Sequence, residues 1–277
     1  MTTAAATPLA MGRVVLTVHD LDRVGDFYQR AVGLHRLQSD PDRLLLGVDG
    51  GVLLELRRDP AARRRSPREA GLFHTAFLLP ERADLGAWCR HAAADRVPVV
   101  GASDHGVSEA IYLSDPEGNG VEIYADRPAS QWRWEGGTVE MPSDGLDIAG
   151  LLDRTEARTW QGFPAGSVVG HVHLQVGALA PAEAFYSGIL GFDITCRYPG
   201  GTFYAADGYH HHIATNIWNS RGAPLRQLPS TGLADVEIRA DASVLKAVAG
   251  RAGAVDPAPS RLSLDDPWGT GITLVAH

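Results

Sequence analysis

The sequence predicts an α+β fold built from four modules, each made of a strand, a helix and three further strands. Two internal repeats lead to this prediction. The stretch GRVVLTV at residues 12–18 aligns with GHVHLQV at residues 170–176, and each precedes a helical stretch that contains Phe-Tyr and ends at glycine. The stretch DPEGNGVE at residues 115–122 aligns with DPWGTGIT at residues 266–273. We therefore place the modules at residues 12–59, 70–126, 168–218 and 230–277.

The elements of each module follow from local patterns. Residues 12–18 and 170–176 fit the two-residue period of a half-buried strand. Asp20 can cap the first helix, and Pro181 suits the first turn of the equivalent helix in the third module. The glycines of the repeated turn suit the tight positions before a last strand. Each module is therefore expected to run from a first strand through a helix to a closing set of strands.

The modules are expected to form two domains. Residues 12–126 make an N-terminal domain and residues 168–277 a C-terminal domain, joined by a linker at residues 127–167. The linker contains three of the six tryptophans and a possible short helix at residues 147–154. Because tryptophan buries a large apolar surface, we expect the linker to pack on the body of the protein.

Composition and charge exclude several classes of function. The chain has 277 residues, of which 44% are hydrophobic and 21% charged, as in an ordinary globular protein. Its net charge of -8 argues against nucleic acid or an anionic membrane as a partner. No apolar run approaches the roughly 20 residues of a membrane span, and the N-terminal segment lacks the features of a secretory signal. Cys89 and Cys196 show no metal-site spacing, so we expect a reducing, cytoplasmic location.

Strand alternation sorts the histidines by face. In the strand at residues 170–176, His171, His173 and Gln175 share one face, opposite an apolar face that should meet the helix. In the last strand of the third module, the isoleucines share the face of His211. The opposite face of that strand carries His210, His212, Asn216 and Trp218. We therefore expect His210 and His212 to face the interior of the sheet, and we favour His212 over His211.

The second module places a carboxylate among apolar residues. Glu122 lies in the last strand of this module, and His74 opens its first strand. A buried carboxylate needs a partner. A metal ion, an arginine or a water molecule could each fill that role.

Two further stretches are more specific than the repeats. They are SDHGVSEAIYLSDPEGNGVEIYADRP at residues 103–128 and GYHHH at residues 208–212. Together with the repeats, they resemble the four-module catechol 2,3-dioxygenase branch of the vicinal oxygen chelate superfamily. The resemblance spans nearly the whole chain. It implies that paired modules curl into cup-shaped mixed β-sheets with helices outside, around a metal ion that binds two neighbouring substrate oxygens.

The resemblance also implies where metal ligands stand, on the first strand of each paired module and on a last strand. The first and fourth modules offer Arg13, Leu54, Asp235 and Thr273 at these positions. The second and third modules offer His74, Glu122, His171 and His212. Only the second set is rich in histidine, so we expect the active cup between the second and third modules, within one chain or across a homodimer. Two-domain extradiol enzymes instead use their third and fourth modules.

The expected metal ligands are His74, Glu122 and His171. This set suits non-haem Fe(II) with open positions, and Mn(II), Zn(II) or Ni(II) could bind in its place. The resemblance assigns His212 as the acid and base, with Tyr112 and His105 contacting the substrate. We expect His210, His173 and Asn216 to line the substrate site. Arg13 is expected either to form a salt bridge in the second cup or to bind a substrate carboxylate there.

The activity that the resemblance implies is Fe(II)-dependent extradiol cleavage of a catechol-type aromatic diol by O2, in the breakdown of aromatic compounds. Two alternatives stay open. One is a glyoxalase-type isomerase or lyase, which a fourth ligand at His212 would favour. The other is a metal-free protein that binds small molecules. Metal content separates the last from the others, and consumption of O2 separates the first two.

Overall fold

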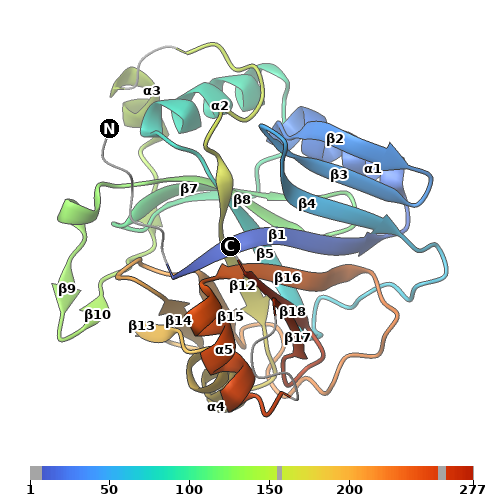
Figure 1. Ribbon diagram of the computed structural model, residues 1–277. Helices are drawn as coiled ribbons and strands as arrows, with labels where there is room; N and C mark the ends of the chain where they lie inside the picture. Colours follow the sequence, from blue (N-terminus) through green and yellow to red (C-terminus); the bar gives the residue numbers. More distant parts are fainter. Residues whose placement is uncertain (1–7, 155–157, 255–259, 277) are drawn as a thin grey trace.

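The computed structural model describes residues 8–154, 158–254 and 260–276. In these residues the strands form a seven-stranded sheet, a nine-stranded sheet and a two-stranded hairpin. Both large sheets mix parallel and antiparallel neighbours, and the helices lie outside them (Figure 1). The α+β fold predicted from the sequence is confirmed.

The first half of the chain contains two modules. The first consists of β1 (Leu9–Val18), α1 (Leu21–Phe27) with its continuation η1 (Tyr28–Val32), β2 (His35–Asp40), β3 (Arg43–Val48) and β4 (Gly51–Arg58). The second consists of β5 (Gly71–Leu78), α2 (Arg82–Ala94), β6 (Gly101–Asp104), β7 (Ser108–Ser114) and β8 (Gly120–Asp126). The Asp20 side chain accepts a hydrogen bond from the Arg23 backbone N–H at 3.0 Å, so it caps α1 as expected.

The second half repeats this order. The third module consists of β12 (Val168–Gln175), α4 (Leu179–Glu183), η3 (Ala184–Ile189), β13 (Asp193–Tyr198), β14 (Gly201–Ala205) and β15 (Ile213–Asn216). The described part of the fourth contains β16 (Gly232–Ala240), α5 (Ala242–Arg251), β17 (Arg261–Asp265) and β18 (Gly271–Ala276). Two strands follow its helix among the described residues where the sequence analysis expected three, and residues 255–259, between α5 and β17, lie outside the described part.

The segment between the halves has structure of its own. It contains η2 (Ala129–Gln131), β9 (Trp134–Glu135), β10 (Thr138–Val139), β11 (Asp144–Gly145) and α3 (Ile148–Arg154). β9 and β10 form the hairpin, and β11 joins the edge of the nine-stranded sheet beside β6. The segment thus passes the β6 edge of that sheet and continues to α3, which lies beside α2 (Figure 1).

Each large sheet combines one module from each half of the chain. The seven-stranded sheet pairs the first module with the fourth, because β1 lies antiparallel to β16. The nine-stranded sheet pairs the second with the third, because β5 lies antiparallel to β12. In Figure 1, β1 (blue) therefore lies beside β16 (orange-red) in one sheet, and β5 (cyan) lies beside β12 (yellow) in the other.

One continuous apolar core joins the two sheets. Val14 and Leu16 on β1, with Val172 and Leu174 on β12, are fully buried in it. Because neighbouring residues of a strand point to opposite faces, the polar residues between them point away from this core. Each sheet therefore presents a polar face on the side away from the core, and on β12 this face carries the histidines.

Buried hydrogen bonds explain why the two sequence motifs recur together. Asp115 accepts two backbone N–H groups of its own turn at 2.8 Å, and the Tyr28 hydroxyl donates to it at 3.4 Å. Asp266 accepts two backbone N–H groups of its turn in the same way, and the Tyr186 hydroxyl donates to it at 3.0 Å. The tyrosine of one module's helix thus anchors the last turn of the next module, so both residues recur.

Candidate metal centre

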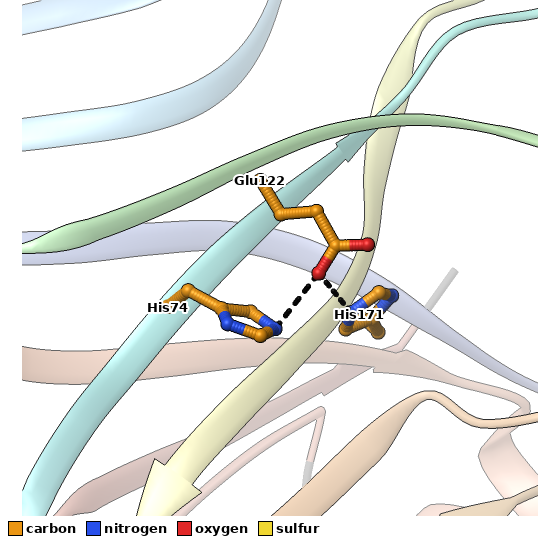
Figure 2. Close-up of side chains that lie close together, drawn as sticks. All are labelled: His74, Glu122 and His171. Atoms are coloured by element: carbon orange, nitrogen blue, oxygen red, sulfur yellow. Dashed lines mark ion pairs between the residues drawn. The ribbon is translucent and has the colours of Figure 1, made fainter. Parts of the chain in front are cut away.

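Three neighbouring strands of the nine-stranded sheet bring together two imidazoles and a carboxylate. His74 lies on β5, Glu122 on β8 and His171 on β12, and the sheet orders these strands β8–β5–β12. The Oε2 atom of Glu122 lies 2.9 Å from His74 Nε2 and 3.3 Å from His171 Nε2 (Figure 2). One nitrogen or oxygen from each residue lies within 4.8 Å of the others. All three come from one chain, so the cluster is complete without a partner subunit.

The cluster is buried and charged. All three side chains are at least nine-tenths buried. Burial by itself raises the pKa of Glu122, but the nearby His171 and His74 outweigh that effect and hold the pKa well below its usual value. Burial lowers the pKa of His171, and Glu122 counteracts this in part. The site is therefore a buried carboxylate facing imidazole nitrogens.

The donor set fits a divalent metal ion. His74 Nε2 is buried and points at the carboxylate without a well-aligned hydrogen bond, although the two atoms are only 2.9 Å apart. Two imidazole nitrogens that converge on one carboxylate oxygen form the arrangement expected of metal ligands. Two histidines and one carboxylate leave several coordination positions open, which suits non-haem Fe(II) enzymes. These residues could hold such an ion together with a small ligand.

A cavity of about 330 Å³ opens onto the cluster. Its walls include all three candidate ligands, together with residues from both modules and from the linker segment. The remaining lining residues are Phe73, Ser103, His105, Tyr112, Met141, Pro142, Ser143, His173, Tyr198, Phe203, His211 and Trp218. The sequence analysis did not identify the phenylalanines or the linker residues of this wall. The three tryptophans of the linker had indicated only that the linker packs on the rest of the protein.

Tyr112 and His105 form a hydrogen-bonded pair in the cavity wall. Tyr112 lies directly opposite Glu122 in the β7–β8 ladder. His105 Nδ1 lies 2.8 Å from the carbonyl oxygen of Pro142, so Nδ1 carries a proton and donates it. With the ring proton on Nδ1, Nε2 accepts, and the Tyr112 O–H donates to it at 2.7 Å. Burial, with the charge of Glu122, raises the pKa of Tyr112, so this hydroxyl stays protonated.

His173 faces the cavity, and Asn216 lies behind it. Asn216 is fully buried, and its amide nitrogen donates to His173 Nε2 at 2.9 Å. Its carbonyl oxygen accepts from the Trp218 backbone N–H at 3.1 Å. Asn216 therefore orients His173, and it does not line the cavity as the sequence analysis expected.

The three successive histidines lie differently from the expected alternation. Residues 210–212 precede β15, which begins at Ile213, so a strand period does not apply to them. His211 lines the cavity, and its ring centroid lies 4.1 Å from that of His171. His210 and His212 are absent from the cavity wall as described. The preceding Gly208, with φ of +70°, marks the turn that could have warned against a continuous strand.

His212 and His210 are instead held by other partners. His212 Nδ1 accepts the Ala206 backbone N–H at 3.3 Å, and its ring packs against Phe192. His210 is fully buried and lies 2.9 Å from Asp126. His211 is thus the histidine of this trio that faces the candidate metal ligands. Burial, reinforced by His171 and His210, holds the pKa of His211 well below its usual value, so its ring is neutral.

His212 is expected to make the fold sensitive to acid. Burial, with repulsion from His210 and His171, lowers its pKa from 6.5 to about 4. Above pH 6.5 the ring is neutral in both the folded and the unfolded chain. As the pH falls from 6.5 towards 4, only the unfolded chain binds the proton, so the free energy of unfolding decreases by up to about 3 kcal/mol.

The variant His212→Asn tests this effect, because the Asn carbonyl can accept the same backbone N–H. Urea unfolding at pH 7 and pH 5 should show a smaller acid-induced loss of stability in the variant than in the wild-type protein. The other buried histidines contribute equally to both proteins. An equal loss in both would rule out His212 as a source of the acid sensitivity.

The seven-stranded sheet has the same three positions with different residues. Glu55 on β4 lies opposite Val15 of β1, just as Glu122 on β8 lies opposite Ala76 of β5. The sequence analysis had placed Leu54 at this position, one residue away. The ligand positions of His74, Glu122 and His171 correspond in the pairing registers to Arg13, Glu55 and Asp235.

Arginines fill the second cup. Glu55 is 1% exposed and lies 3.1 Å from Arg13, 3.0 Å from Arg43 and 2.8 Å from Arg57. Arg13 also lies 3.4 Å from Glu237. Burial alone raises the pKa of Glu55, but the arginines outweigh it and lower the pKa. Arg13 therefore takes part in salt bridges, one of the two roles left open for it, and supplies the positive charge opposite this carboxylate.

Two sheets that each pair two strand–helix–strand modules define a glyoxalase-like fold. A putative dioxygenase from Bacillus subtilis subsp. subtilis str. 168 matches it with a TM-score of 0.62 and 15% identity, over 99% of this chain and 86% of that one. Glyoxalase I from Zea mays matches with a TM-score of 0.57 and 16% identity, over 97% and 92% of the two chains. At these identities the likeness concerns the fold alone.

Sequence comparison gives the family. A catechol-2,3-dioxygenase of Bacillus subtilis (strain 168) is 41% identical over 228 residues, which are 80% of each chain. A biphenyl-2,3-diol 1,2-dioxygenase 3 of Rhodococcus globerulus is 30% identical over 136 residues, 43% of this chain and 65% of that protein. Residues 10–123 match the model of the Glyoxalase/Bleomycin resistance protein/Dioxygenase superfamily. The chain belongs to this superfamily, and the resemblance seen in the sequence is confirmed. Within the described residues, no helix is long and apolar enough to span a membrane.

Proposed function

We propose that this protein is an Fe(II)-dependent extradiol dioxygenase that opens the ring of a catechol with O2. The observation that carries the proposal is the buried cluster of two histidines and one glutamate at the floor of an aromatic cavity. The similarity to a catechol-2,3-dioxygenase supports it. Mn(II), Zn(II) or Ni(II) would bind the same ligands, so the choice of iron follows from the proposed reaction.

His74, Glu122 and His171 would hold the ion. When bound, Fe(II) supplies a centre that coordinates two neighbouring hydroxyl oxygens and activates O2. In the overall reaction the carbon–carbon bond beside the diol breaks, and both atoms of O2 enter the product, a muconic semialdehyde. The chain itself must bind and orient the diol, exclude water and move its protons.

His211 is the residue placed to take a proton from the diol. It lines the cavity beside His171, and its Nδ1 is engaged by His210 at 2.7 Å, which leaves Nε2 for the substrate. A positioned neutral imidazole is a common general base. Tyr112, whose O–H donates to His105, presents its hydroxyl oxygen in the cavity wall, where it can accept a hydrogen bond from a substrate hydroxyl and orient the ring.

The cavity walls favour neutral, apolar ring substituents. Phe73, Met141, Phe203 and Trp218 line it, and no lysine or arginine does among the described lining residues. A carboxylate on the ring would lose water without gaining a cationic partner, which is costly. The preferred catechols should therefore carry alkyl or aryl groups.

The test is O2 uptake by protein reconstituted anaerobically with Fe(II), with alkyl- and phenylcatechols compared with 3,4-dihydroxybenzoate. We expect uptake matched by a yellow ring-opened product, with kcat/KM about 10-fold or more higher for the apolar diols. Verified metal binding without uptake would contradict the dioxygenase proposal and favour an isomerase or lyase. Against that alternative stands His212, which would be the fourth ligand but lies outside the cavity wall as described.

A further inference from the structure

A chain of hydrogen bonds leads away from the cavity behind His211. His211 Nδ1 lies 2.7 Å from His210 Nδ1, and His210 Nε2 lies 2.9 Å from Asp126 Oδ1. The second carboxylate oxygen of Asp126 accepts the Tyr209 O–H at 3.0 Å. The chain joins the histidine loop of the third module to the end of β8 in the second. Both ring nitrogens of His210 are therefore engaged.

The direction of each hydrogen bond follows from the carboxylate at its end. An ionised Asp126 only accepts, so His210 donates through Nε2. With its proton on Nε2, His210 accepts through Nδ1, and this requires the proton of His211 to lie on Nδ1. His211 Nε2 is consequently unprotonated, and no hydrogen bond of Nε2 to a described residue is seen.

The central ring of this chain of hydrogen bonds, that of His210, is shielded from water. His210 has no exposed surface, and the ring of Trp132, from the linker segment, lies against it with centroids 5.1 Å apart. The ring of Tyr209 also lies against it, with centroids 4.0 Å apart. Because His210 itself has no exposed surface, its two ring nitrogens bond Asp126 and His211, and the tautomer set by Asp126 passes through this ring to His211.

We propose that Asp126 and His210 are positioning residues that hold His211 in the tautomer whose Nε2 accepts the substrate proton. This inference rests on the proposed function. In the step concerned, the O–H bond of the diol breaks and an N–H bond forms at His211 Nε2. The resulting imidazolium keeps its Nδ1–H bond to His210, and the carboxylate of Asp126 faces its positive charge across one neutral ring.

The variant Asp126→Asn is expected to reverse the donor and acceptor roles in this series of hydrogen bonds, with almost no change in the shape of the side chain. The Asn carbonyl can still accept from Tyr209, while its amide donates to His210 Nε2. His210 must then donate from Nδ1, and His211 must carry its proton on Nε2, where it blocks the base. We expect kcat to fall at least 30-fold while KM and bound iron stay within threefold of wild type.

Two control variants separate this effect from a general loss of packing. Tyr209→Phe removes a hydrogen bond of the same carboxylate but leaves the tautomers unchanged, so kcat should stay within threefold. Asp126→Glu keeps a carboxylate acceptor and should recover at least part of the activity that Asp126→Asn loses. Equal losses in these two variants of Asp126, or a kcat of Asp126→Asn within threefold of wild type, would overturn the proposal.

A measurement independent of activity distinguishes this inference from the proposed function. Long-range proton–nitrogen NMR spectra of the protein loaded with diamagnetic Zn(II) report which ring nitrogen carries hydrogen. We expect His211 protonated on Nδ1 in the wild type and on Nε2 in Asp126→Asn. Protonation on Nε2 in the wild type would overturn the inference. The expected tautomers in a wild type that cleaves no catechol would support the inference and contradict the proposed function alone.

Discussion

Glu122→Gln is expected to abolish metal binding and ring cleavage while leaving the fold intact. The amide keeps the volume of the side chain but removes the negative charge that faces His74 and His171 at 2.9 and 3.3 Å. A divalent ion would then meet two neutral imidazoles and a weak carbonyl donor. We expect the affinity for Fe(II) to fall about 100-fold or more. Loss of a residue that only hydrogen-bonds a metal ligand lowers metal affinity by about 10- to 100-fold, and loss of a ligand should lower it further. Metal content after dialysis and anaerobic titration measure this directly.

Glu55→Gln is the matched control, because Glu55 occupies the equivalent position in the other sheet. Its removal leaves Arg13, Arg43 and Arg57 without their shared carboxylate, so the melting temperature should fall. Metal content and kcat should not change, because Arg13 stands where a ligand would be. Retention of a full equivalent of iron by the Glu122→Gln variant, or its loss from the Glu55→Gln variant, would contradict the assignment of the metal site.

His211→Gln is expected to lower kcat by roughly 100- to 10,000-fold, the usual contribution of a positioned general base. Bound iron and KM should change little, because the three candidate ligands are untouched and the cavity keeps its aromatic walls. Stopped-flow measurement of ring opening, with iron content determined on the same sample, separates a chemical defect from a loss of metal.

His212→Asn provides the comparison for that experiment. His212 is the next residue in the chain, but its Nδ1 bonds the Ala206 backbone, outside the described cavity wall. We expect its kcat to stay within about threefold of wild type, because His212 does not line the cavity as described and Asn can accept the same Ala206 N–H. A large loss of kcat at His212 with a small one at His211 would favour the assignment made from strand alternation.

Long-range pairing could be predicted where residue chemistry discriminated between modules. Periodicity indicated the first strands, and the repeats indicated the modules. At the ligand positions that the resemblance implied, the histidines of the second and third modules then indicated which pair of modules shares a sheet, because Arg13 and Asp235 cannot form a histidine-rich site. Register was harder to predict, because a shift of one residue exchanges the two faces of a strand. That is why Glu55 was missed in favour of Leu54.

The wall of the cavity could not be predicted from the same patterns. Residues 210–212 lie in the loop between β14 and β15, where side-chain directions depend on individual backbone angles and not on a period. Met141 and Pro142 belong to a segment without periodicity that reaches the cavity through tertiary packing. The contact of Pro142 with His105 joins residues from separate segments, and local sequence carries little information about such a contact.

The pairing of β5 with β12 gives a bound ion a mechanical role. His74 and Glu122 belong to the first half of the chain and His171 to the second, and the halves are connected by a single covalent segment. An ion held by all three would fasten one half to the other as a cross-link does. Its binding free energy would then add to the free energy that holds the two halves of the chain together. Loss of the metal would weaken that cohesion at the same time as it ended catalysis.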